Sequence, residues 1–293
     1  MNVAPQMLVS PLLPKTQGMT DETFQALRGH IYSMTGIYFQ DNKKYLLESR
    51  ISKRLQMLKI AEYEGYLQYL KFGTKKEEEK KFLFDAITIN ETYFFRNEPQ
   101  FEIFEKTLVP EISKLKGIGS RSKLRVWSAA SSSGEEAHTI AMIFLEKIKP
   151  KYPNLELEVI GTDISSTVLE TARRGIYREY AVRNMPKAYF DKYFIKDDGK
   201  FTVIDAVRRL VRFDHLNLYD QAKMKMMANI DVAFCCNVLI YFDMKSKIQV
   251  VSNIYNSLNR GGFLFIGYAE SLHGISSAFK IINFPKAIVY KKE

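Results

Sequence analysis

Residues 123–147, KLRVWSAASSSGEEAHTIAMIFLEK, decide the fold, because a strand-like run, a turn of small residues and a helical segment follow one another directly. The strand is predicted at 123–129 and the helix at 134–147. A strand that leads straight into a helix is the opening unit of an α/β sheet, since the helix can pack back onto the sheet. The next elements along the chain decide whether the sheet continues.

The chain after this unit alternates in the same way. Strands are predicted at 156–163, 211–217, 230–235 and 262–268, and helices at 166–174 and 244–259. This alternation predicts a largely parallel, Rossmann-like α/β sheet. The closing stretch FKIINFPKAIVYKK reads as a hairpin, and an antiparallel close suits the sheet of a methyltransferase. A DDGK turn predicts a short β-insertion at about 189–212.

The pattern upstream of the sheet is helical. Residues 1–18 contain prolines and are aperiodic, so we expect a flexible N-terminal tail. The small helical domain is predicted at 19–85, with helices at 20–36, 42–60, 62–72 and 75–84. A linker at 86–97 then leads into the α/β domain at 98–293.

Composition restricts the class of protein. The 293 residues are 46% hydrophobic and 26% charged, which is ordinary for a globular protein with a buried core. No apolar run approaches the ~20 residues of a membrane helix, and the N-terminus lacks a basic signal-peptide region, so we expect a cytoplasmic protein without membrane insertion. The net charge of +10 favours an acidic partner, but nucleic acid, an anionic membrane surface and a Glu-rich protein all qualify.

The turn between the first strand and helix is acidic. It has one glycine and no lysine, and two carboxylates begin the helix, so it is unlike a phosphate-binding loop. Small residues from Ser128 to Gly134 would let the backbone approach a ligand. Ser133 and Glu136 have the spacing of a capping box. An acidic turn suits S-adenosylmethionine, which is cationic, better than NAD or ATP, although an ordinary capped helix explains the segment equally well.

Two further polar residues follow strands, at the sheet edge where α/β proteins bind ligands. Asp163 ends the second strand, where a carboxylate can accept hydrogen bonds from ribose hydroxyls; it could instead cap the next helix, although Ser165 can do that. Asn237 leaves an apolar strand with an amide that could meet adenine or the methionine end. The adjacent Cys235 and Cys236 read as small core residues, and no metal site is predicted.

Several motifs resemble the CheR family, the chemotaxis receptor methyltransferases. The specific ones are TINETYFFR at 88–96 and NVLIYF at 237–242, and RVWSAASSSGEEAHTIAM, IGTDIS, GIY and GGFLFIGYAESLHG stand in the family's order. The resemblance covers about residues 20–290. It implies transfer of a methyl group from S-adenosylmethionine to glutamate side chains of methyl-accepting chemotaxis receptors. The products would be glutamate methyl esters and S-adenosylhomocysteine.

The resemblance also implies a set of site residues. Arg96 and Tyr241 would lie near the methyl group, Glu136 would take the methionine ammonium, and Asp163 would take the ribose. The cofactor-binding residues would be Asn90, Thr92, Arg96, Ala130, Glu136, Asp163, Asn217, Leu218, Cys236 and Asn237. The receptor's cytoplasmic helices would meet a basic helix that contains Lys43, Lys44, Arg50, Lys53 and Arg54.

The sequence departs from the family in three places. Cys236 stands where the family usually has arginine, the family's STGEEPY reads SSGEEAH, and the β-insertion is short. Family members that grip a receptor's C-terminal pentapeptide carry a longer, glycine-rich loop there, so the resemblance implies that this protein does not use that tether. We expect a monomer. His138 and His215 have no evident partner in the sequence and are interpreted as structural. An acceptor glutamate is already ionised at neutral pH, so no general base is required.

Two other functions remain open at this point. A nucleic-acid methyltransferase fits the charge and the fold class, but the turn CNVLIYF lacks the proline of the Asn/Asp-Pro-Pro-aromatic motif that holds a flipped base. A cofactor- or nucleotide-sensing adaptor, with turnover lost through Cys236, is the other alternative.

Overall fold

The computed structural model describes residues 18–117 and 122–293, and these form two compact units. The first unit comprises residues 18–28 and 39–87, and the second comprises residues 29–38 and 88–293. The flexible tail predicted at 1–18 lies outside the described residues, except for Gly18. No helix within the described ranges is both long enough and apolar enough to cross a membrane.

The first unit is helical. It holds the start of α1 (Asp21–Thr35), the short η1 (Asp41–Lys43), α2 (Lys44–Leu58), α3 (Tyr63–Phe72) and α4 (Lys76–Ile87). Helix α1 begins where the Thr20 hydroxyl accepts a hydrogen bond from the Thr23 amide at 3.1 Å, as an N-cap residue does. The core of the unit is apolar and includes Leu47, Ile51 and Leu55 of α2, which recur at helical spacing and are fully buried.

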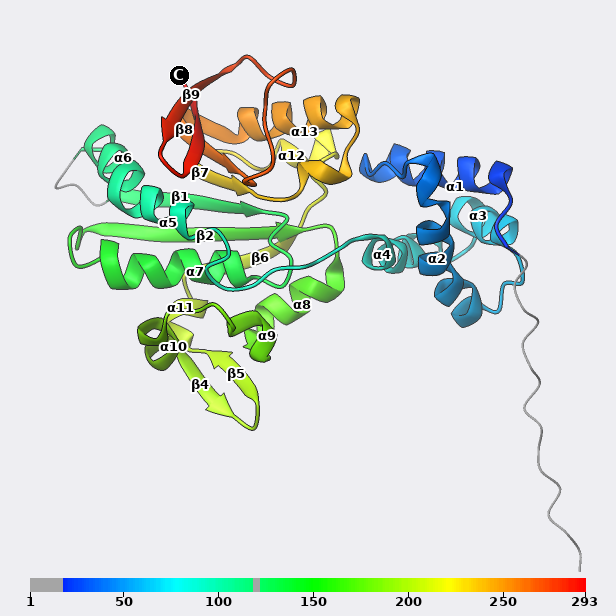
Figure 1. Cartoon of the computed structure of the whole chain (residues 1–293), viewed down its shortest axis with the longest axis horizontal. Helices are drawn as coiled ribbons and strands as arrows, with labels where there is room; N and C mark the ends of the chain where they lie inside the picture. The colour runs from blue at the N-terminus through cyan, green and yellow to red at the C-terminus, as the bar shows by residue number, and fades with distance from the viewer. Residues whose placement is uncertain (1–17, 118–121) are drawn as a thin grey trace, which may run out of the picture. The chain divides into compact units, whose positions relative to one another are not determined.

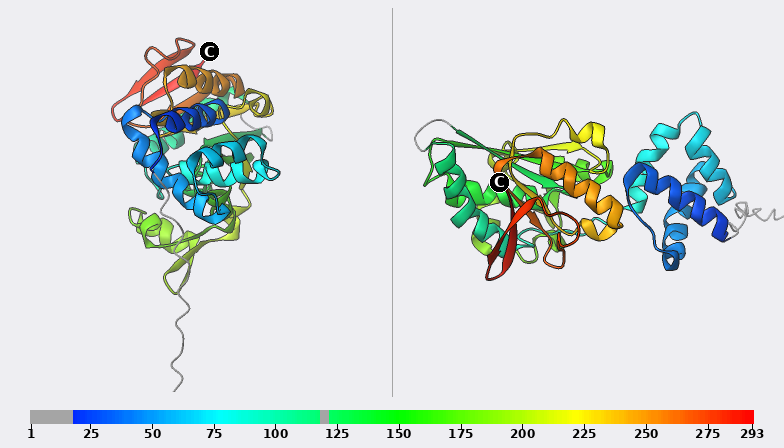
Figure 2. Two further views of the ribbon diagram at one scale, coloured as in Figure 1. Left: turned by 90° about the vertical axis from the view of Figure 1, so that its right-hand side faces the viewer. Right: turned by 90° about the horizontal axis from the view of Figure 1, so that it is seen from above.

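The second unit is built on a seven-stranded sheet of order β6-β2-β1-β7-β8-β10-β9. Its strands are β1 (Ser122–Ala129), β2 (Leu155–Asp163), β6 (Val211–His215), β7 (Ile230–Cys235), β8 (Leu258–Ile266), β9 (Phe279–Phe284) and β10 (Ala287–Lys292). The first five are parallel, and β9 and β10 form an antiparallel hairpin beside β8 (Figure 2). The predicted Rossmann-like methyltransferase sheet with an antiparallel close is therefore confirmed.

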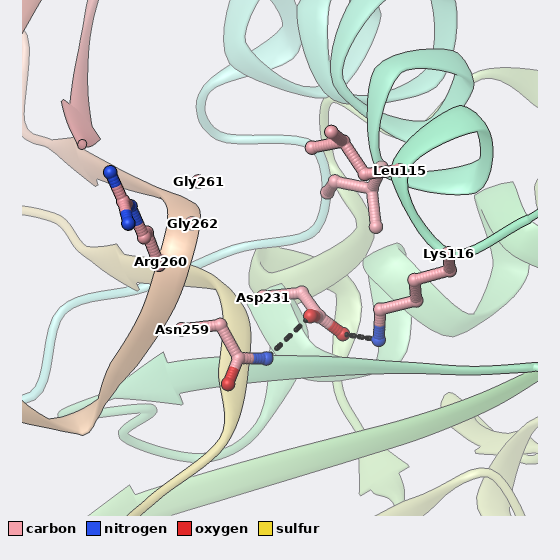
Figure 3. Close-up of a pocket in the computed structure, with 8 residues that line it drawn as sticks. Leu115, Lys116, Asp231, Asn259, Arg260, Gly261 and Gly262 are labelled. Carbon is pink, nitrogen blue, oxygen red and sulfur yellow. Dashed lines mark hydrogen bonds and ion pairs between the residues drawn. The ribbon is translucent and has the colours of Figure 1, made fainter.

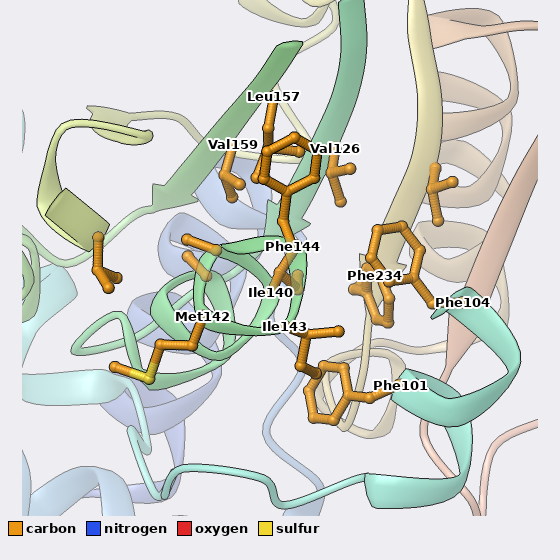
Figure 4. Close-up of a cluster of buried hydrophobic side chains, with 14 of the residues drawn as sticks. Phe101, Phe104, Val126, Ile140, Met142, Ile143, Phe144, Leu157, Val159 and Phe234 are labelled. Carbon is orange, nitrogen blue, oxygen red and sulfur yellow. The ribbon is translucent and has the colours of Figure 1, made fainter. Parts of the chain in front are cut away.

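Alternate residues of the strands enter two separate cores, because side chains of a strand point to opposite faces. Val126 and Phe234 belong to the core under α5 (Glu98–Ile103), η2 (Phe104–Leu108), α6 (Val109–Leu115), α7 (Glu135–Ile143), η3 (Phe144–Ile148) and α8 (Ser166–Arg174) (Figure 4). Trp127 and Cys235 belong to the core under α12 (Gln221–Met224) and α13 (Met244–Ser257). The sheet is thus covered on both faces (Figure 1).

A second, three-stranded sheet of order β3-β5-β4 lies between α8 and β6 in the chain. Its strands are β3 (Ile176–Tyr177), β4 (Phe194–Asp197) and β5 (Lys200–Val203). The same segment of the chain forms the short helices α9 (Glu179–Val182), α10 (Lys187–Tyr193) and α11 (Asp205–Arg208). The β4–β5 turn has Asp198 and Gly199 at φ 40° and 69°, as a tight hairpin requires. The small sheet reaches further toward the N-terminus than 189–212, because β3 pairs with β5.

Candidate functional site

Three neighbouring parallel strands bring the predicted ligand segments to one edge of the sheet. β1 lies between β2 and β7, with Ala129 opposite Thr162 and Ser128 opposite Phe234. The turns that leave these strands at Ala130, Asp163 and Asn237 therefore meet at the carboxyl ends. This is the place where the strand order changes direction, and open α/β sheets bind ligands there.

The turn after β1 has an unusual backbone. Ala130, Ser132 and Gly134 have φ values of 58°, 51° and 92°, and such conformations in non-glycine residues often occur at binding sites. Gly134 is required, because a Cβ at this position would lie 2.8 Å from both Ala172 and Phe213. The Ser132 hydroxyl donates to the Asn90 carbonyl at 3.0 Å, which ties the turn to the segment before α5.

The predicted capping box of Ser133 and Glu136 is wrong. Gly134 precedes α7, so the Ser133 hydroxyl instead donates to the Glu135 carboxylate at 2.8–2.9 Å. The Glu136 carboxylate accepts from the Ser128 hydroxyl at 2.7 Å. The left-handed glycine displaces serine from the capping position, and Glu136 is left at the ligand-binding edge.

Glu136 is partly exposed and lies close to both Arg96 and Cys236. Burial raises the pKa of Glu136 to about 7, while the Ser128 hydrogen bond, the Cys236 thiol and the Arg96 charge oppose the rise. A cationic ligand group at this carboxylate would favour its ionised form. The site therefore fits the ammonium of S-adenosylmethionine.

Cys236 also contacts this pocket. Its thiol donates to Gln100 Oε1 at 3.2 Å, and Gln100 in turn donates to the Ile266 carbonyl at 2.6 Å. Burial raises the pKa of the Cys236 thiol well above its usual value, and the nearby Glu136 adds to the rise. Cys236 is therefore a neutral thiol that offers no positive charge to the pocket.

The Asn237 turn is held by a residue that sequence reasoning did not select. Asn237 has a φ of 60°, and the Glu270 carboxylate accepts from the backbone amides of Asn237, Gly267 and Ile240 at 2.9, 2.6 and 3.2 Å. A Cβ at Gly267 would lie 2.7–2.8 Å from Glu270 and Asn237. The feature of the sequence that could have identified Glu270 is the motif GGFLFIGYAESLHG, in which Glu270 is the acidic residue.

Asp163 accepts two backbone hydrogen bonds. Its carboxylate oxygens accept from the Ser132 and Ser165 amides, each at 2.9 Å, and the residue is 5% exposed. Ser165, as expected, caps α8 by accepting from the Val168 amide. Asp163 thus positions the β1 turn, and its contact with ribose stays a prediction.

The other predicted cofactor residues lie in the same unit. Asn217 donates to the Met34 carbonyl at 2.7 Å and accepts from the Tyr219 amide at 3.0 Å, so its amide already bonds to the protein. Leu218 is buried in the core under α13. Thr92 is partly exposed, and so is Tyr241 at the end of η4 (Leu239–Tyr241). Their roles toward the cofactor stay predictions.

Both histidines bond within the protein, which agrees with their structural interpretation, although their partners were not evident in the sequence. His138 Nδ1 lies 2.9 Å from the Tyr177 hydroxyl, which donates to the Ser133 carbonyl at 2.7 Å. Burial lowers the pKa of His138 to about 3, so the imidazole is neutral. His215 Nε2 lies 2.9 Å from the Ile164 carbonyl. Tyr177, in the motif GIY, thereby links the small sheet to the cofactor turn.

Arg54, one of the predicted receptor-binding residues, is buried in the helical unit. It is 9% exposed and forms a bidentate ion pair with Glu79. Its Nε donates to Glu79 Oε1 at 2.9 Å, and its Nη2 donates to Oε2 at 2.6 Å. Tyr66 also donates to Glu79, at 2.8 Å. This buried partner lies in another helix, α4, and the contact of Arg54 with a receptor stays a prediction.

The remaining basic residues of this set differ in exposure. Arg50 is partly exposed and donates to the Ile87 carbonyl, and Lys44 pairs with Asp21 at 2.7 Å. Lys43 and Lys53 are exposed.

A separate pocket of about 300 Å³ lies at the opposite ends of the strands (Figure 3). Its Asp231, at the start of β7, accepts from Lys116 at 2.6 Å and from Asn259 at 2.7 Å. Because its carboxylate is already neutralised and it lies at the amino ends of the strands, we do not assign this pocket to the cofactor.

The fold and the acidic turn at the switch in strand order define the class of S-adenosylmethionine-dependent methyltransferases. Family models agree: "CheR methyltransferase, SAM binding domain" matches residues 90–288, and "CheR methyltransferase, all-alpha domain" matches residues 22–88. The chain belongs to the CheR methyltransferase family, as the motifs indicated, and its cofactor is S-adenosylmethionine.

Relatives of known name span nearly the whole chain. It is 36% identical to chemotaxis protein methyltransferase 2 of Vibrio cholerae, over 94% of each chain. It is 34% identical to the chemotaxis protein methyltransferase of Borreliella burgdorferi, over 94% of this chain and 95% of the relative. The similarity therefore includes the helical unit as well as the sheet.

Proposed function

We propose that this enzyme methylates glutamate side chains of chemoreceptors and forms methyl esters. The relatives' names support chemotaxis as the setting. The observation that carries the chemistry is the placement of Glu136 and Arg96 at one ligand-binding edge, close enough for the Arg96 charge to lower the pKa of Glu136. A carboxylate suits the cationic donor, and a guanidinium suits an anionic acceptor.

S-adenosylmethionine supplies an electrophilic methyl group on its sulfonium. Glu136, supported by the Ser128 hydroxyl, would bind the ammonium, and Asp163 would accept from the ribose. Arg96 and Tyr241 would orient the acceptor carboxylate. Asn90, Ala130, Asn217, Leu218 and Asn237 would line the rest of the cofactor pocket, with Thr92 beside Arg96.

No residue has to remove a proton, because a glutamate with an ordinary pKa of about 4.3 is ionised at neutral pH. The chain's contribution is alignment, which can supply up to ~7–11 kcal/mol, together with exclusion of water from the acceptor carboxylate. The tightly bonded turns at Ser132 and Asn237 provide the rigidity that alignment needs.

The test is transfer of labelled methyl from S-adenosylmethionine to receptor-containing membranes, followed by alkaline release of volatile methanol. Receptors in which the accepting glutamates are replaced by alanine are the matched control. We expect base-labile label in the first preparation and none in the second. Base-stable label, or equal label in both, would contradict glutamate ester formation.

We further propose that the helical unit recognises the receptor through Lys43, Lys44, Arg50 and Lys53. The short β4–β5 turn supports recognition without a C-terminal pentapeptide tether. Receptors that lack their last five residues should then be methylated at the same rate as intact receptors. A large loss of rate on truncation would assign a tether to the small sheet.

A further inference from the structure

An arginine on the second unit is enclosed by two tyrosines. The guanidinium carbon of Arg183 lies 3.9 Å from the ring centre of Tyr93 and 3.6 Å from that of Tyr180. Both rings therefore pack against this guanidinium at cation–π distance. We call these three residues the arginine stack.

Hydrogen bonds fix the arginine stack to the motif segment before α5. Arg183, the residue after α9, donates to the Tyr180 carbonyl, and the Tyr180 hydroxyl donates to Glu91 Oε1 at 3.0 Å. Arg96 donates to the Glu91 carbonyl at 2.6 Å. The side chain of Arg183 is therefore held in place before any partner arrives.

The arginine stack is exposed and carries a charge without a carboxylate partner. Arg183 is exposed, and Tyr180 is 57% exposed. Within the described residues, no Asp or Glu forms an ion pair with Arg183. The tyrosine rings contact the Arg183 guanidinium but form no ion pair with it. Its edge N–H groups can therefore donate to a planar acceptor.

The arginine stack is continuous with the proposed methyl-transfer site through Arg96. The Arg96 guanidinium lies 5.8 Å from the Tyr93 ring centre. The hydrogen bond to Glu91 raises the pKa of Tyr180, and the charges of Arg183 and Arg96 oppose this rise. Arg96 also lies close enough to Glu136 for its charge to lower the pKa of that carboxyl.

We propose that the arginine stack docks an acidic side chain of the protein substrate that neighbours the glutamate being methylated. The inference rests on the proposed function and names a second contact for its acceptor. A carboxylate matches the free edge of Arg183 in charge and shape, and the tyrosine rings can contact its methylene stem.

The main variant is Arg183→Glu, and Lys225→Glu on another exposed segment is the control with the same change in net charge. We expect the KM for receptor membranes to rise about three- to tenfold in Arg183→Glu, because exposed charge pairs contribute modestly. The kcat and the Kd for S-adenosylmethionine should stay unchanged, and the salt dependence of the KM should flatten. Arg183→Lys should have an intermediate effect, since an ammonium lacks the planar fork.

A receptor KM in Arg183→Glu equal to that of Lys225→Glu would overturn the proposal. So would a changed Kd for S-adenosylmethionine in Arg183→Lys, because the arginine stack would then act on the cofactor pocket. Competition of a single-stranded RNA oligonucleotide with receptor membranes, lost in Arg183→Glu, would overturn it in favour of nucleic acid.

A binding measurement separates this proposal from the proposed function. Co-sedimentation of the full chain with receptor membranes needs no turnover, and we expect it to weaken in Arg183→Glu and not in Lys225→Glu. If the unaltered chain binds these membranes but transfers no methyl group, the proposed function is wrong. Co-sedimentation of the variants then still tests the docking contact. Equal co-sedimentation of the two variants overturns the docking contact alone.

Discussion

Replacement of Glu136 by glutamine tests whether this carboxylate holds the cofactor ammonium. Its pKa of about 7 means that the Glu136 carboxyl is only half ionised at neutral pH before the ligand binds. If binding requires the ionised form, the apparent Kd is multiplied by one plus the ratio of protonated to ionised carboxylate. From pH 7.5 to pH 5.5 this factor grows about twentyfold, so affinity should fall as pH falls. An α-amino group, with a pKa of about 7.7–8.0, stays mostly protonated over this range.

Titration calorimetry with S-adenosylmethionine gives the measurement. In the unaltered chain the Kd should weaken about twentyfold over this range, with about half a proton released per ligand bound at pH 7. Glu136→Gln should weaken binding about ten- to hundredfold at pH 7.5, the value of one charge-assisted hydrogen bond of about 1.5–3 kcal/mol. Its Kd should hardly depend on pH, so the two curves should approach one another at pH 5.5.

Glu135→Gln is the matched control. Glu135 is adjacent in sequence, and burial raises its pKa to about 7 as well, but its carboxylate bonds to Ser133 and is only 3% exposed. Its glutamine variant should keep the full pH dependence of binding. If Glu136→Gln keeps that dependence and Glu135→Gln loses it, the ammonium contact has been assigned to the wrong carboxylate.

Four further predictions follow from single contacts. Asp163→Ala should fold and bind S-adenosylmethionine about ten- to hundredfold more weakly by calorimetry; an unchanged Kd would remove Asp163 from the ribose site. Arg54→Ala should lower the free energy of unfolding in urea by about 3–5 kcal/mol, because it leaves the Glu79 carboxylate buried without its partner; a loss below about 1 kcal/mol would argue against a buried ion pair. Glu135→Gln should raise the free energy of unfolding at pH 7.5, by at most about 3 kcal/mol, and change it little at pH 5. The sign follows because a carboxyl whose pKa is raised by folding destabilises the native state as pH rises from about 4.5 through 7. Cys236→Arg should fold and tighten S-adenosylmethionine binding or raise the rate; abolished binding would mean a pocket rebuilt around a small residue.

Hydrophobic periodicity predicted the large sheet and most of the longer helices, although it gave no prediction for α5, η2 and α6. Leu47, Ile51 and Leu55 recur on one face of α2, and all three are buried. Val126 and Trp127 were predicted within one strand, and they enter opposite cores. Such patterns are local, since each element must present its own apolar face to a core. The fold class could therefore be predicted before any long-range contact was known.

The side-chain network of the site could not be predicted in the same way. Tyr177 reaches His138 across 39 residues, and Asn237 meets Glu270 across 33. These pairs leave no periodic signal, because each depends on the course of the backbone between its members. The ion pair of Arg54 was missed for the same reason, since its partner Glu79 lies 25 residues away in α4.

The neutral thiol of Cys236 helps to explain the raised pKa of Glu136. A buried carboxylate stays ionised when a cation lies beside it, and Arg96 alone only partly offsets the burial of Glu136. The neutral thiol of Cys236 supplies no second cation beside this carboxylate. The pocket therefore keeps a proton near neutral pH that an arginine would displace. Cofactor binding in this chain should consequently be more sensitive to pH than in the Cys236→Arg variant, whose Glu136 should titrate at a lower pH.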